Sequence, residues 1–244
     1  MKITDAVWEQ RNLGVTSYGI SLDMRDHLQD VQKEYSKLQE KEYMVVKIPS
    51  SRYDLAYYFQ EQGYLFSESS IRLSCDLQKL YIPERILKIC KKCTWVEMKK
   101  EDLDQLSKEI YKDIFKKDKV FTDPKFKPEQ SARRYDLWIR DLVSAGTMPY
   151  KVMYGGDTIG FFLNQKIEKN AYYGVMAAVY SDYEGTGMGY CIQYAGLQSA
   201  IERGADTYIG YVSGTNPEVL KILLSIGYVI KEIDYIFIKH NEGE

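Results

Sequence analysis

The stretch Val179-Tyr-Ser-Asp-Tyr-Glu-Gly-Thr-Gly-Met-Gly-Tyr190 reads as the end of a strand, a glycine-rich turn and the start of a helix. Gly185, Gly187 and Gly189 alternate along the turn. Glycine has no side chain, so it lets a backbone approach a ligand closely. The first turn of a helix has unpaired N–H groups that attract an anion. The stretch therefore predicts a cradle for the pyrophosphate of a phosphorylated cofactor.

The composition is that of an ordinary globular chain. Its 244 residues are 45% hydrophobic and 28% charged, which leaves room for two domains. The net charge of −2 gives no electrostatic reason to expect nucleic acid or an anionic membrane as a partner. No apolar run approaches the ~20 residues of a membrane helix, and the first residues lack the apolar core of a signal peptide. We therefore expect a cytoplasmic protein.

The cysteines and histidines argue against a metal site. Cys90 and Cys93 form a single CxxC, whereas a zinc ribbon needs a second pair or nearby histidines. Cys75 and Cys191 stand alone in apolar surroundings, which is typical of buried thiols. The chain has only 2 histidines, so neither a metal cluster nor a histidine base is expected.

An internal repeat relates two parts of the chain. Residues 44–64 align without a gap to residues 208–228, and each copy reads as an apolar strand, a polar turn and an amphipathic helix. Gly63 and Gly227 follow the last helical residue, a position that favours glycine. The copies share little identity, so duplication and convergence both stay open. The flanking helices and strands are expected at residues 24–41, 70–75, 188–203 and 235–239.

A boundary near residue 93 divides the chain into two domains. Pro83 and the lysines around it interrupt the repeating pattern. We therefore predict an N-terminal α/β domain at residues 1–93 and an α+β domain at residues 94–244. The first repeat has Ser21-Leu-Asp-Met24 where the second has its glycine-rich turn. Phosphate binding should accordingly belong to the C-terminal domain alone.

The C-terminal domain has a recognisable order of elements. It reads as a strand, two helices, a three-stranded meander, the glycine turn and then helix–strand–helix–strand. Gly155-Gly156-Asp157 is typical of a hairpin turn between two strands of the meander. Before the glycine turn, strands are expected at residues 94–98, 148–154, 159–165 and 171–179, and helices at 101–114 and 129–143.

This order resembles the GNAT superfamily of acyl-CoA N-acyltransferases. The family signature has Arg or Gln, two free positions, Gly, one free position, then Gly or Ala; residues 184–189 read Glu-Gly-Thr-Gly-Met-Gly. A later family motif has Asn, a small residue, Tyr and Gly-aromatic, represented here by Asn216, Val219, Leu223, Gly227 and Tyr228. The resemblance implies the GNAT fold, a mixed central sheet flanked by helices. Through the repeat, the N-terminal domain resembles a degenerate half copy of that fold.

The resemblance implies acetyl-CoA as co-substrate and a small-molecule amine as acceptor. In the family, the glycine turn holds the pyrophosphate and the edge of the preceding strand binds the pantetheine arm. A backbone N–H on that strand polarises the thioester carbonyl. The implied cofactor-binding residues are Ala177, Ala178, Val179, Glu184, Gly185, Thr186, Gly187, Met188, Gly189, Tyr190 and Asn216.

A narrower resemblance concerns the acceptor. Phe121-Thr-Asp-Pro-Lys-Phe126, followed by Ala132, Tyr135 and Trp138, is similar to the acceptor-side segment of the dTDP-fucosamine acetyltransferases. Those enzymes also carry an additional N-terminal domain, whose start resembles residues 13–20. They acetylate an amino group on a nucleotide-linked sugar, so the resemblance implies such an acceptor. The sequence leaves the oligomeric state open, and a homodimer is compatible with it.

Two residues depart from the family pattern. Leu223 stands where the family commonly has a Tyr whose hydroxyl protonates the leaving thiolate, and leucine has no proton to donate. Glu184 replaces the Arg or Gln beside the pyrophosphate. A carboxylate turned toward the pyrophosphate would repel it by roughly 1 kcal/mol, so we expect Glu184 to face solvent.

The catalytic residues stay unassigned at this stage. Nearby candidates for the proton donor are Tyr172, Tyr173, Tyr190 and Tyr211. Glu168 and Asp182 are the acidic residues near the expected site, and neither is assigned as a base. The motif order favours an N-acetyltransferase. The two departures favour the alternative, a non-catalytic acyl-CoA-binding or assembly module.

Overall fold

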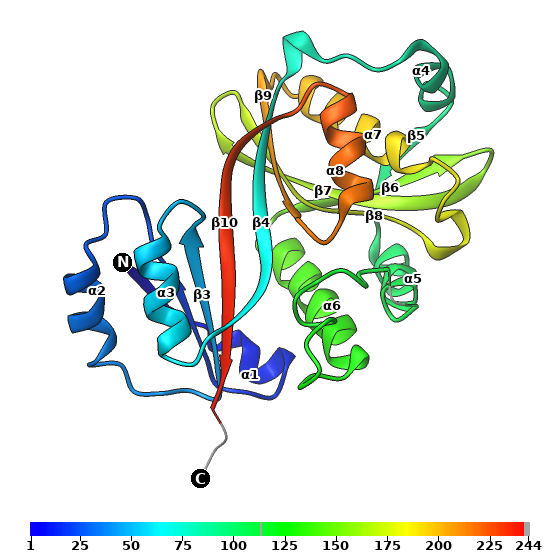
Figure 1. Ribbon diagram of the computed structural model, residues 1–244. Coiled ribbons are helices and arrows are strands. Elements are labelled where there is room, and N and C mark those ends of the chain that lie inside the picture. Colours follow the sequence, from blue (N-terminus) through cyan, green and yellow to red (C-terminus); the bar gives the residue numbers. More distant parts are fainter. Residues whose placement is uncertain (113, 242–244) are drawn as a thin grey trace.

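The computed structural model describes residues 1–112 and 114–241, whose strands form one ten-stranded mixed sheet (Figure 1). Within the predicted C-terminal domain, residue 113, which is part of the helix expected at 101–114, and residues 242–244 therefore lie outside the described part. The strand order is β1-β2-β3-β10-β4-β9-β8-β7-β6-β5. The strands are β1 Lys2–Asp5, β2 Ser17–Ser21, β3 Tyr43–Pro49, β4 Leu65–Asp76, β5 Thr94–Glu97, β6 Met148–Tyr154, β7 Asp157–Glu168, β8 Ala171–Val179, β9 Thr207–Ser213 and β10 Val229–His240.

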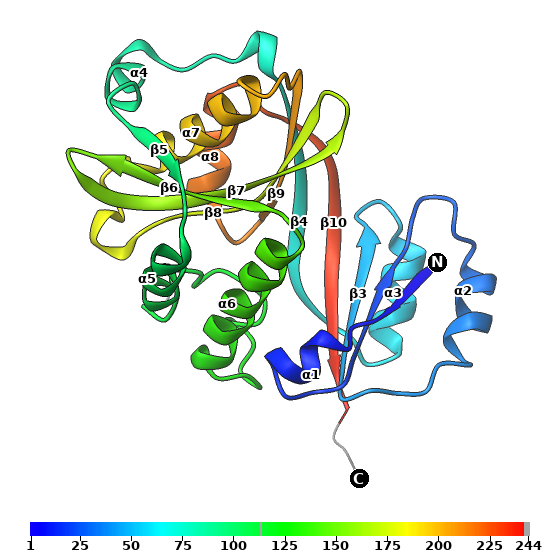
Figure 2. The ribbon, with the colours of Figure 1, turned by 180° about the vertical axis from the view of Figure 1, so that it is seen from behind.

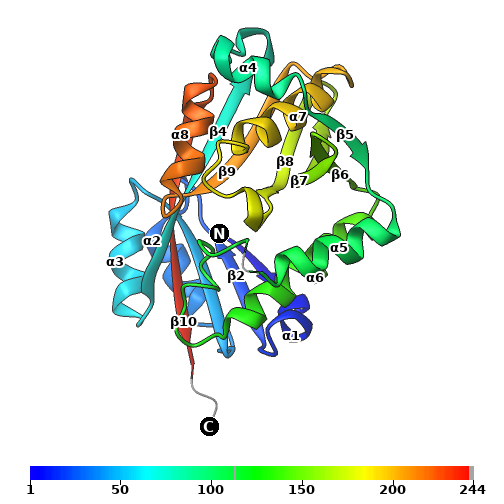
Figure 3. The same cartoon turned by 90° about the vertical axis from the view of Figure 1, so that its right-hand side faces the viewer.

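Helices cover both faces of this sheet (Figures 2 and 3). α2, α3, α7 and α8 lie on one face, and α1, α5 and α6 lie on the other, while α4 packs beside α7. The helices are α1 Trp8–Asn12, α2 Leu28–Tyr35, α3 Tyr53–Glu61, α4 Glu84–Cys90, α5 Lys100–Ile110, α6 Pro128–Ser144, α7 Gly189–Ile201 and α8 Pro217–Ser225.

The internal repeat of the sequence is present in the structure. β3, α3 and β4 have the same lengths as β9, α8 and β10, with 7, 9 and 12 residues respectively. The two sets begin at Tyr43 and Thr207, so one offset of 164 residues (207 − 43) relates all three pairs of elements. We call β1–β4 with their helices the N-terminal repeat and β7–β10 with theirs the C-terminal repeat.

The last strands of the two repeats are exchanged. β4 lies between β9 and β10, and β10 lies between β3 and β4. β4 is the last strand of the N-terminal repeat but lies beside β9 of the C-terminal repeat. In the same way, β10 is the last strand of the C-terminal repeat but lies beside β3 of the N-terminal repeat (Figure 1). The boundary predicted at residue 93 falls between α4 and β5, and it stays a prediction; the segments on its two sides share this one sheet.

A pseudo-two-fold axis passes through the β4–β10 ribbon. Ser70 of β4 pairs with Asp234 of β10, and the offset of the repeat (234 − 70) makes these two residues equivalent. The register between the two strands skips Ser67 and Lys231, which are also equivalent (231 − 67). Bulges increase the local twist of a ribbon, and here they lie symmetrically about the axis. The pairing itself thus supports duplication over convergence.

Two predicted helices, two predicted strands and one predicted cysteine environment differ from the structure. The strands expected at residues 70–75 and 235–239 are the longer β4 and β10. The helix expected at residues 24–41 is the shorter α2, and the helix expected at 101–114 ends at Ile110. At the end of α2, the Ser36 hydroxyl donates to the Lys33 carbonyl at 2.9 Å, which supports a turn where apolar spacing alone would have continued the helix. Cys191 is buried but not isolated, because α4 brings the Cys90 Sγ to 3.5 Å from the Cys191 Sγ.

The segment between α5 and α6 packs on the N-terminal repeat. The Phe126 ring meets the Tyr43 ring edge to face, with centroids 5.1 Å apart. Val120 belongs to the same core cluster. Asp123 is buried, and its Oδ2 lies 2.7 Å from Nε2 of His240 at the end of β10. The two repeats are therefore joined on this face of the sheet as well as through it.

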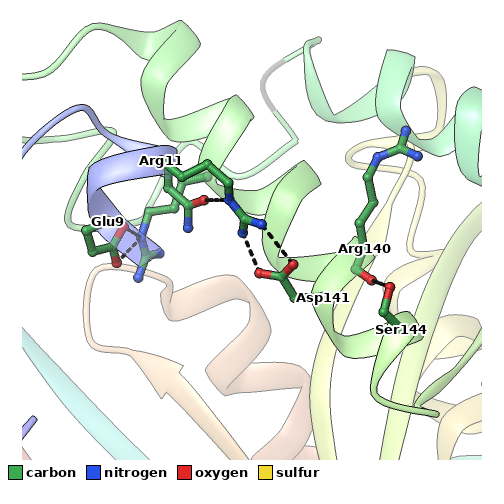
Figure 4. A network of polar contacts seen from close by, with 7 residues as sticks. Glu9, Arg11, Arg140, Asp141 and Ser144 are labelled. Carbon is green, nitrogen blue, oxygen red and sulfur yellow. Dashed lines mark hydrogen bonds and ion pairs between the residues drawn. The ribbon is translucent and has the colours of Figure 1, made fainter. Parts of the chain in front are cut away.

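α1 docks on α6 through two arginine–carboxylate pairs. The Arg134 Nε donates to the buried Glu9 carboxylate at 2.9 Å. Arg11 binds Asp141 at the surface (Figure 4). A cavity of about 320 Å³ lies between the two helices and is lined by Trp8, Glu9, Asn12, Arg134, Trp138 and Asp141.

The next two features are groups of side chains that could bind a metal ion and helices that could span a membrane. Within residues 1–112 and 114–241, no group of three or more His, Cys, Asp or Glu side chains is arranged to hold a metal ion. Over the same ranges, no helix combines the length and apolarity needed to span a membrane.

Candidate functional site

β8 and β9 are parallel neighbours that separate partway along their length. Their register begins at Ala171 and Thr207 and stops at Gly174 and Gly210. β8 nevertheless continues to Val179, still paired with β7 on its other side. A wedge therefore opens in the sheet beyond Gly174, between the second half of β8 and the end of β9.

A buried polar clamp holds the closed end of the wedge. The Tyr208 hydroxyl donates to the Asn164 side-chain oxygen, and the Asn164 amide donates to the Gly196 carbonyl at 2.8 Å. Burial raises the pKa of Tyr208, so its hydroxyl keeps the proton that it donates. A Cβ at Gly174 would lie 2.5 Å from that hydroxyl oxygen, so the site requires glycine. The clamp joins β7, β9 and α7, and the strands separate only beyond it.

The open edge of β8 presents backbone groups to the wedge. The Tyr180 N–H donates to the Ile159 carbonyl at 2.9 Å, on the β7 side. Backbone groups alternate in direction along a strand, so Ala178 also faces β7. Ala177 and Val179 face the wedge, where the register shows no β9 partner. Of the three β8 residues predicted to bind the cofactor, these two have free main-chain groups.

The loop after β8 presents unpaired donors at the start of α7. Gly185 and Gly187 have φ angles of 73° and 84°, in the region that favours glycine. A Cβ at either residue would meet nothing within 4 Å, so the space before the loop is open. The N–H groups of Gly185, Gly187 and Gly189 have no acceptor among the residues that the structure describes. With the positive end of α7 behind them, they form a site suited to an anion.

The remaining residues predicted for the cofactor have structural contacts of their own. The Tyr190 hydroxyl lies 3.1 Å from Ser225 Oγ, which ties α7 to α8. Asn216 caps α8, with its side chain accepting from the Val219 N–H at 3.4 Å. Met188 is half-buried against the core beneath α7. The Thr186 hydroxyl donates within the loop to the preceding turn. Their contacts with a cofactor stay predictions.

Glu184 lies at the surface beside a lysine. Its side chain is 49% exposed, and its Oε2 is 3.7 Å from Lys116 Nζ. The carboxylate therefore reaches solvent, as the sequence analysis expected. Lys116 also neutralises part of its charge, which weakens the repulsion of an anion held by the neighbouring amides.

The structure separates the candidate proton donors. Leu223 and Tyr172 are both buried in the core under α7 and α8. Tyr173 and Tyr211 lie on the opposite face of the sheet, at the closed end of the wedge, with ring centroids 5.8 Å apart. Burial raises the pKa of Tyr173 to about 12. The hydroxyl of Tyr173 therefore stays protonated at neutral pH.

The two acidic residues considered from the sequence lie at opposite ends of β8. Glu168 is exposed at the hairpin between β7 and β8, at the end opposite the glycine loop. Asp182 is exposed in the short turn that follows β8.

A carboxylate that sequence reasoning missed lies beside the end of β9. The hydroxyl of Ser213, the last residue of β9, donates to Glu68 Oε2. Burial raises the pKa of Glu68. Glu68 belongs to the N-terminal repeat and reaches this position only because β4 lies next to β9. The alternating polar residues of β4 indicated a strand, but they did not indicate that β9 would be the strand beside it.

Solved structures of GNAT acetyltransferases are similar to this chain over most of its length. A GCN5-related N-acetyltransferase from Sphaerobacter thermophilus matches with a TM-score of 0.60 and 12% identity, covering 98% of this chain and 75% of that one. One from Kribbella flavida has a TM-score of 0.56 and 14% identity, with coverages of 93% and 82%. A tandem GNAT protein from the clavulanic acid biosynthesis pathway has a TM-score of 0.54 and 9% identity, with coverages of 88% and 68%.

These likenesses show that the chain has the GNAT fold. They confirm the predicted α+β class, with a mixed central sheet flanked by helices. No family model matches the sequence, and no curated protein matches it. The narrower resemblance to nucleotide-sugar acetyltransferases stays a prediction.

Proposed function

We propose that this protein is an acetyl-CoA-dependent N-acetyltransferase that acts on a primary amine of a small molecule. One observation carries the proposal: the wedge leads directly to the glycine loop that follows β8. The open main-chain groups of Ala177 and Val179 lead along β8 to the unpaired N–H groups of Gly185 and Gly189. An extended ligand with amides in its middle and a pyrophosphate at its end matches this sequence of donors and acceptors.

The chain's own residues supply most of the binding chemistry. The N–H groups of the loop and the N-terminus of α7 hold the pyrophosphate without adding a buried cation. The free groups of Ala177 and Val179 hold the pantetheine amides as a neighbouring strand would. A Cβ on Gly189 would lie 2.9 Å from Ile222 Cδ1, so glycine also lets α7 and α8 lie close together beside the wedge.

The reaction makes modest demands on the protein. Acetyl-CoA supplies an activated thioester, so holding an amine in line with it accounts for much of the rate. Wedge-facing N–H groups on β8 polarise the carbonyl. Leu223 cannot donate a proton to the leaving sulfur. The hydroxyls of Tyr173 and Tyr211, which lie at the closed end of the wedge, are the donors that we assign to the leaving sulfur.

The acceptor proposal rests on sequence resemblance and on the fold. The segment from Phe121 to Phe126, which resembles the acceptor side of nucleotide-sugar acetyltransferases, packs on β3 and on the end of β10. We therefore extend the proposal to an amino sugar linked to a nucleotide as the acceptor. A panel of free amino sugars, nucleotide-linked amino sugars and simple alkylamines would rank the candidates by kcat/KM.

Two matched glycine variants test the cofactor site. Gly187 and Gly204 have φ angles of 84° and 78°, and neither would place a Cβ near another atom. Changing either to Ala should cost about 1 kcal/mol of stability through backbone strain. Only Gly187→Ala should also weaken the affinity for CoA in calorimetry. Equal affinities in the two variants, or an intact protein that does not bind CoA, would refute the proposed site.

The second candidate function is a non-catalytic acyl-CoA-binding module. The burial of Leu223 favours it, because the family's usual proton donor is absent and its position is closed by core packing. That function predicts CoA binding with no acetyl transfer to any amine in the panel. Measured turnover that falls in Tyr173→Phe or Tyr211→Phe would exclude it.

A further inference from the structure

Glu68 lies where the N-terminal repeat meets the wedge of the C-terminal repeat. Ser70 of β4 pairs with Ser213 of β9, which places Glu68 just past the end of β9. Its side chain contacts Ser213 on the face of the sheet that carries α5 and α6. Tyr211 lies two residues before Ser213, so its side chain points to this same face. The carboxylate and the tyrosine pair thus share one side of the open wedge.

The pseudo-two-fold axis relates Glu68 to a second glutamate with which it can be compared. Its equivalent across the axis is Glu232 (232 − 68), which is 56% exposed and whose Oε1 lies 2.8 Å from Arg72 Nη1. The residue that pairs with Glu68 is Ile236, the equivalent of Arg72 (236 − 72). β10 therefore places no basic side chain opposite Glu68. One glutamate is neutralised on the surface, while the other is half-buried and accepts one hydroxyl.

The surroundings of Glu68 leave one oxygen available. Oε2 accepts from Ser213, and within the described residues Oε1 has no hydrogen-bond partner. The Ser213 oxygen also lies 2.8 Å from Thr215 Oγ1, whose own proton goes to the Lys117 carbonyl at 3.0 Å. The Ser213 hydroxyl therefore donates its own proton to the Glu68 carboxylate, and this hydrogen bond orients the carboxylate. Oε1 remains free to accept a proton from a bound group.

The charges around Glu68 suit a proton acceptor. Lys119, from the segment between α5 and α6, and Arg134, from α6, favour the ionised form, whereas Asp118 opposes it. Ser213 faces it from β9 and Ile236 from β10. Burial outweighs the favourable contacts and raises the pKa of Glu68 above its ordinary value. A raised pKa means that this carboxylate binds a proton more readily than an exposed glutamate.

We propose that Glu68 is the base that takes the proton from the acceptor ammonium, a catalytic residue that the N-terminal repeat supplies to the C-terminal site. This inference rests on the proposed function. The ammonium gives one proton to Glu68 Oε1, and the neutral amine attacks the acetyl carbon. The C–N bond forms, the C–S bond breaks, and a second proton of the nitrogen leaves with the sulfur, relayed through the tyrosine hydroxyls. Glu68 then releases its proton to water.

Glu68→Gln and Glu232→Gln form a matched pair for the test. Each replaces one of two equivalent glutamates by its neutral isostere. With the best amine of the panel, kcat/KM is measured from about pH 6 to about pH 10, and CoA affinity by calorimetry. Glu68→Gln should lower kcat/KM about 100-fold or more at neutral pH. The loss should shrink as pH rises, because the amine then loses its proton without a base. Glu232→Gln should match the wild type, and CoA affinity should not change.

A second variant reports on Glu68 without removing it. Ser213→Ala deletes the hydrogen bond that favours the ionised carboxylate, so it should raise the pKa of Glu68 further. The acid limb of the pH–rate profile should therefore move to higher pH, while the rate at high pH is kept. An unshifted profile in an active Ser213→Ala protein would count against the role of Glu68.

The outcomes separate this inference from the proposed function. A Glu68→Gln protein with the wild-type profile would overturn the inference and leave the acetyltransferase intact. A loss of equal size at every pH would assign Glu68 a structural role and overturn the inference too. A wild-type protein that binds CoA but acetylates no amine would overturn the proposed function, and the catalytic role of Glu68 with it.

Discussion

The two repeats hold equivalent strand pairs in opposite states. In the N-terminal repeat, β2 and β3 stay paired up to Ser21 and Lys47, and the Leu22 N–H extends the pairing to the Lys47 carbonyl at 2.9 Å. In the C-terminal repeat, β8 and β9 separate after Gly174 and Gly210. β2 ends with this pairing, whereas β8 continues to Val179 without a β9 partner, so a wedge opens in the C-terminal repeat.

The turns that follow these strands differ in the same way. In the N-terminal repeat, the Asp23 N–H donates to Asp26 Oδ2 at 2.8 Å and the Arg25 N–H to Asp23 Oδ1 at 2.7 Å. Carboxylates of the chain itself therefore occupy these donors. In the C-terminal repeat, the donors of Gly185 and Gly187 stay open. The comparison teaches that an anion site depends on which donors the chain leaves unpaired, as well as on a helix N-terminus.

The largest expected effect comes from separating the repeats. A protein of residues 94–244 lacks β4, so β9 and β10 lose the strand between them. It also loses Leu73 and Cys75, which are fully buried in the core of the C-terminal repeat. We expect this fragment not to fold, as measured by circular dichroism and by amide dispersion in NMR. A folded fragment that binds CoA would show that the repeats are independent and that residue 93 marks a true domain boundary.

Core substitutions in the exchanged strands test the coupling more gently. Leu73→Ala, in β4, removes packing from the C-terminal core, and Phe237→Ala, in β10, removes it from the N-terminal core. Each should lower the free energy of unfolding by about 2–5 kcal/mol. Because the strands are shared, urea should unfold both repeats in one transition. Tyr57→Ala on the exposed side of α3 is the control and should change stability by about 0.5 kcal/mol or less. Two transitions would contradict the coupling.

The contact between α1 and α6 offers a smaller test. Glu9→Gln removes the buried carboxylate that Arg134 binds, leaves the half-buried Arg134 without it and should cost about 2–3 kcal/mol. Asp141→Asn removes the exposed pair with Arg11 and should cost about 1 kcal/mol or less. Urea denaturation of both variants measures the difference. Equal costs would mean that burial does not decide the worth of these two pairs.

The smallest expected effect is a pH dependence of stability. The pKa of Glu68 is raised in the folded protein, so folding favours the protonated form. Its contribution to stability is present below its ordinary pKa and is lost as pH rises through the folded value. Glu68→Gln should therefore match the wild type at low pH and become relatively more stable at higher pH. For Glu232→Gln no such trend is expected, and a parallel trend in both variants would remove Glu68 as its source.

Local elements could be predicted from the sequence because their patterns are local. β6 and β8 begin and end where alternating apolar residues predicted them. The hairpin between β6 and β7 has Gly155 and Gly156 at φ angles of 61° and 97°, as a two-glycine turn requires. The repeat was also visible, since strand, turn and helix recur at a constant spacing. Helix ends were less predictable, as α2 shows, because a local turn competes with apolar periodicity.

The candidate site could be predicted only in part. The glycine loop and the β8 edge follow from residues close together in the chain. The wedge itself depends on Tyr208 meeting Asn164, which lie in different strands and are clamped to α7. Glu68 was out of reach, because no local pattern says that β4 lies beside β9 rather than beside its own repeat's strand β3.

The sequence by itself determined the repeated strand–helix–strand unit and the turn at residues 185–189, whose glycines leave main-chain donors open among the described residues. Both depend on backbone preferences within a few residues. Only the tertiary structure decided that β4 and β10 are exchanged, and therefore that Glu68 of one repeat borders the wedge of the other. Strand neighbours are chosen by pairing between distant segments and by the core that they bury together. A chain read in order contains no local signal for that choice.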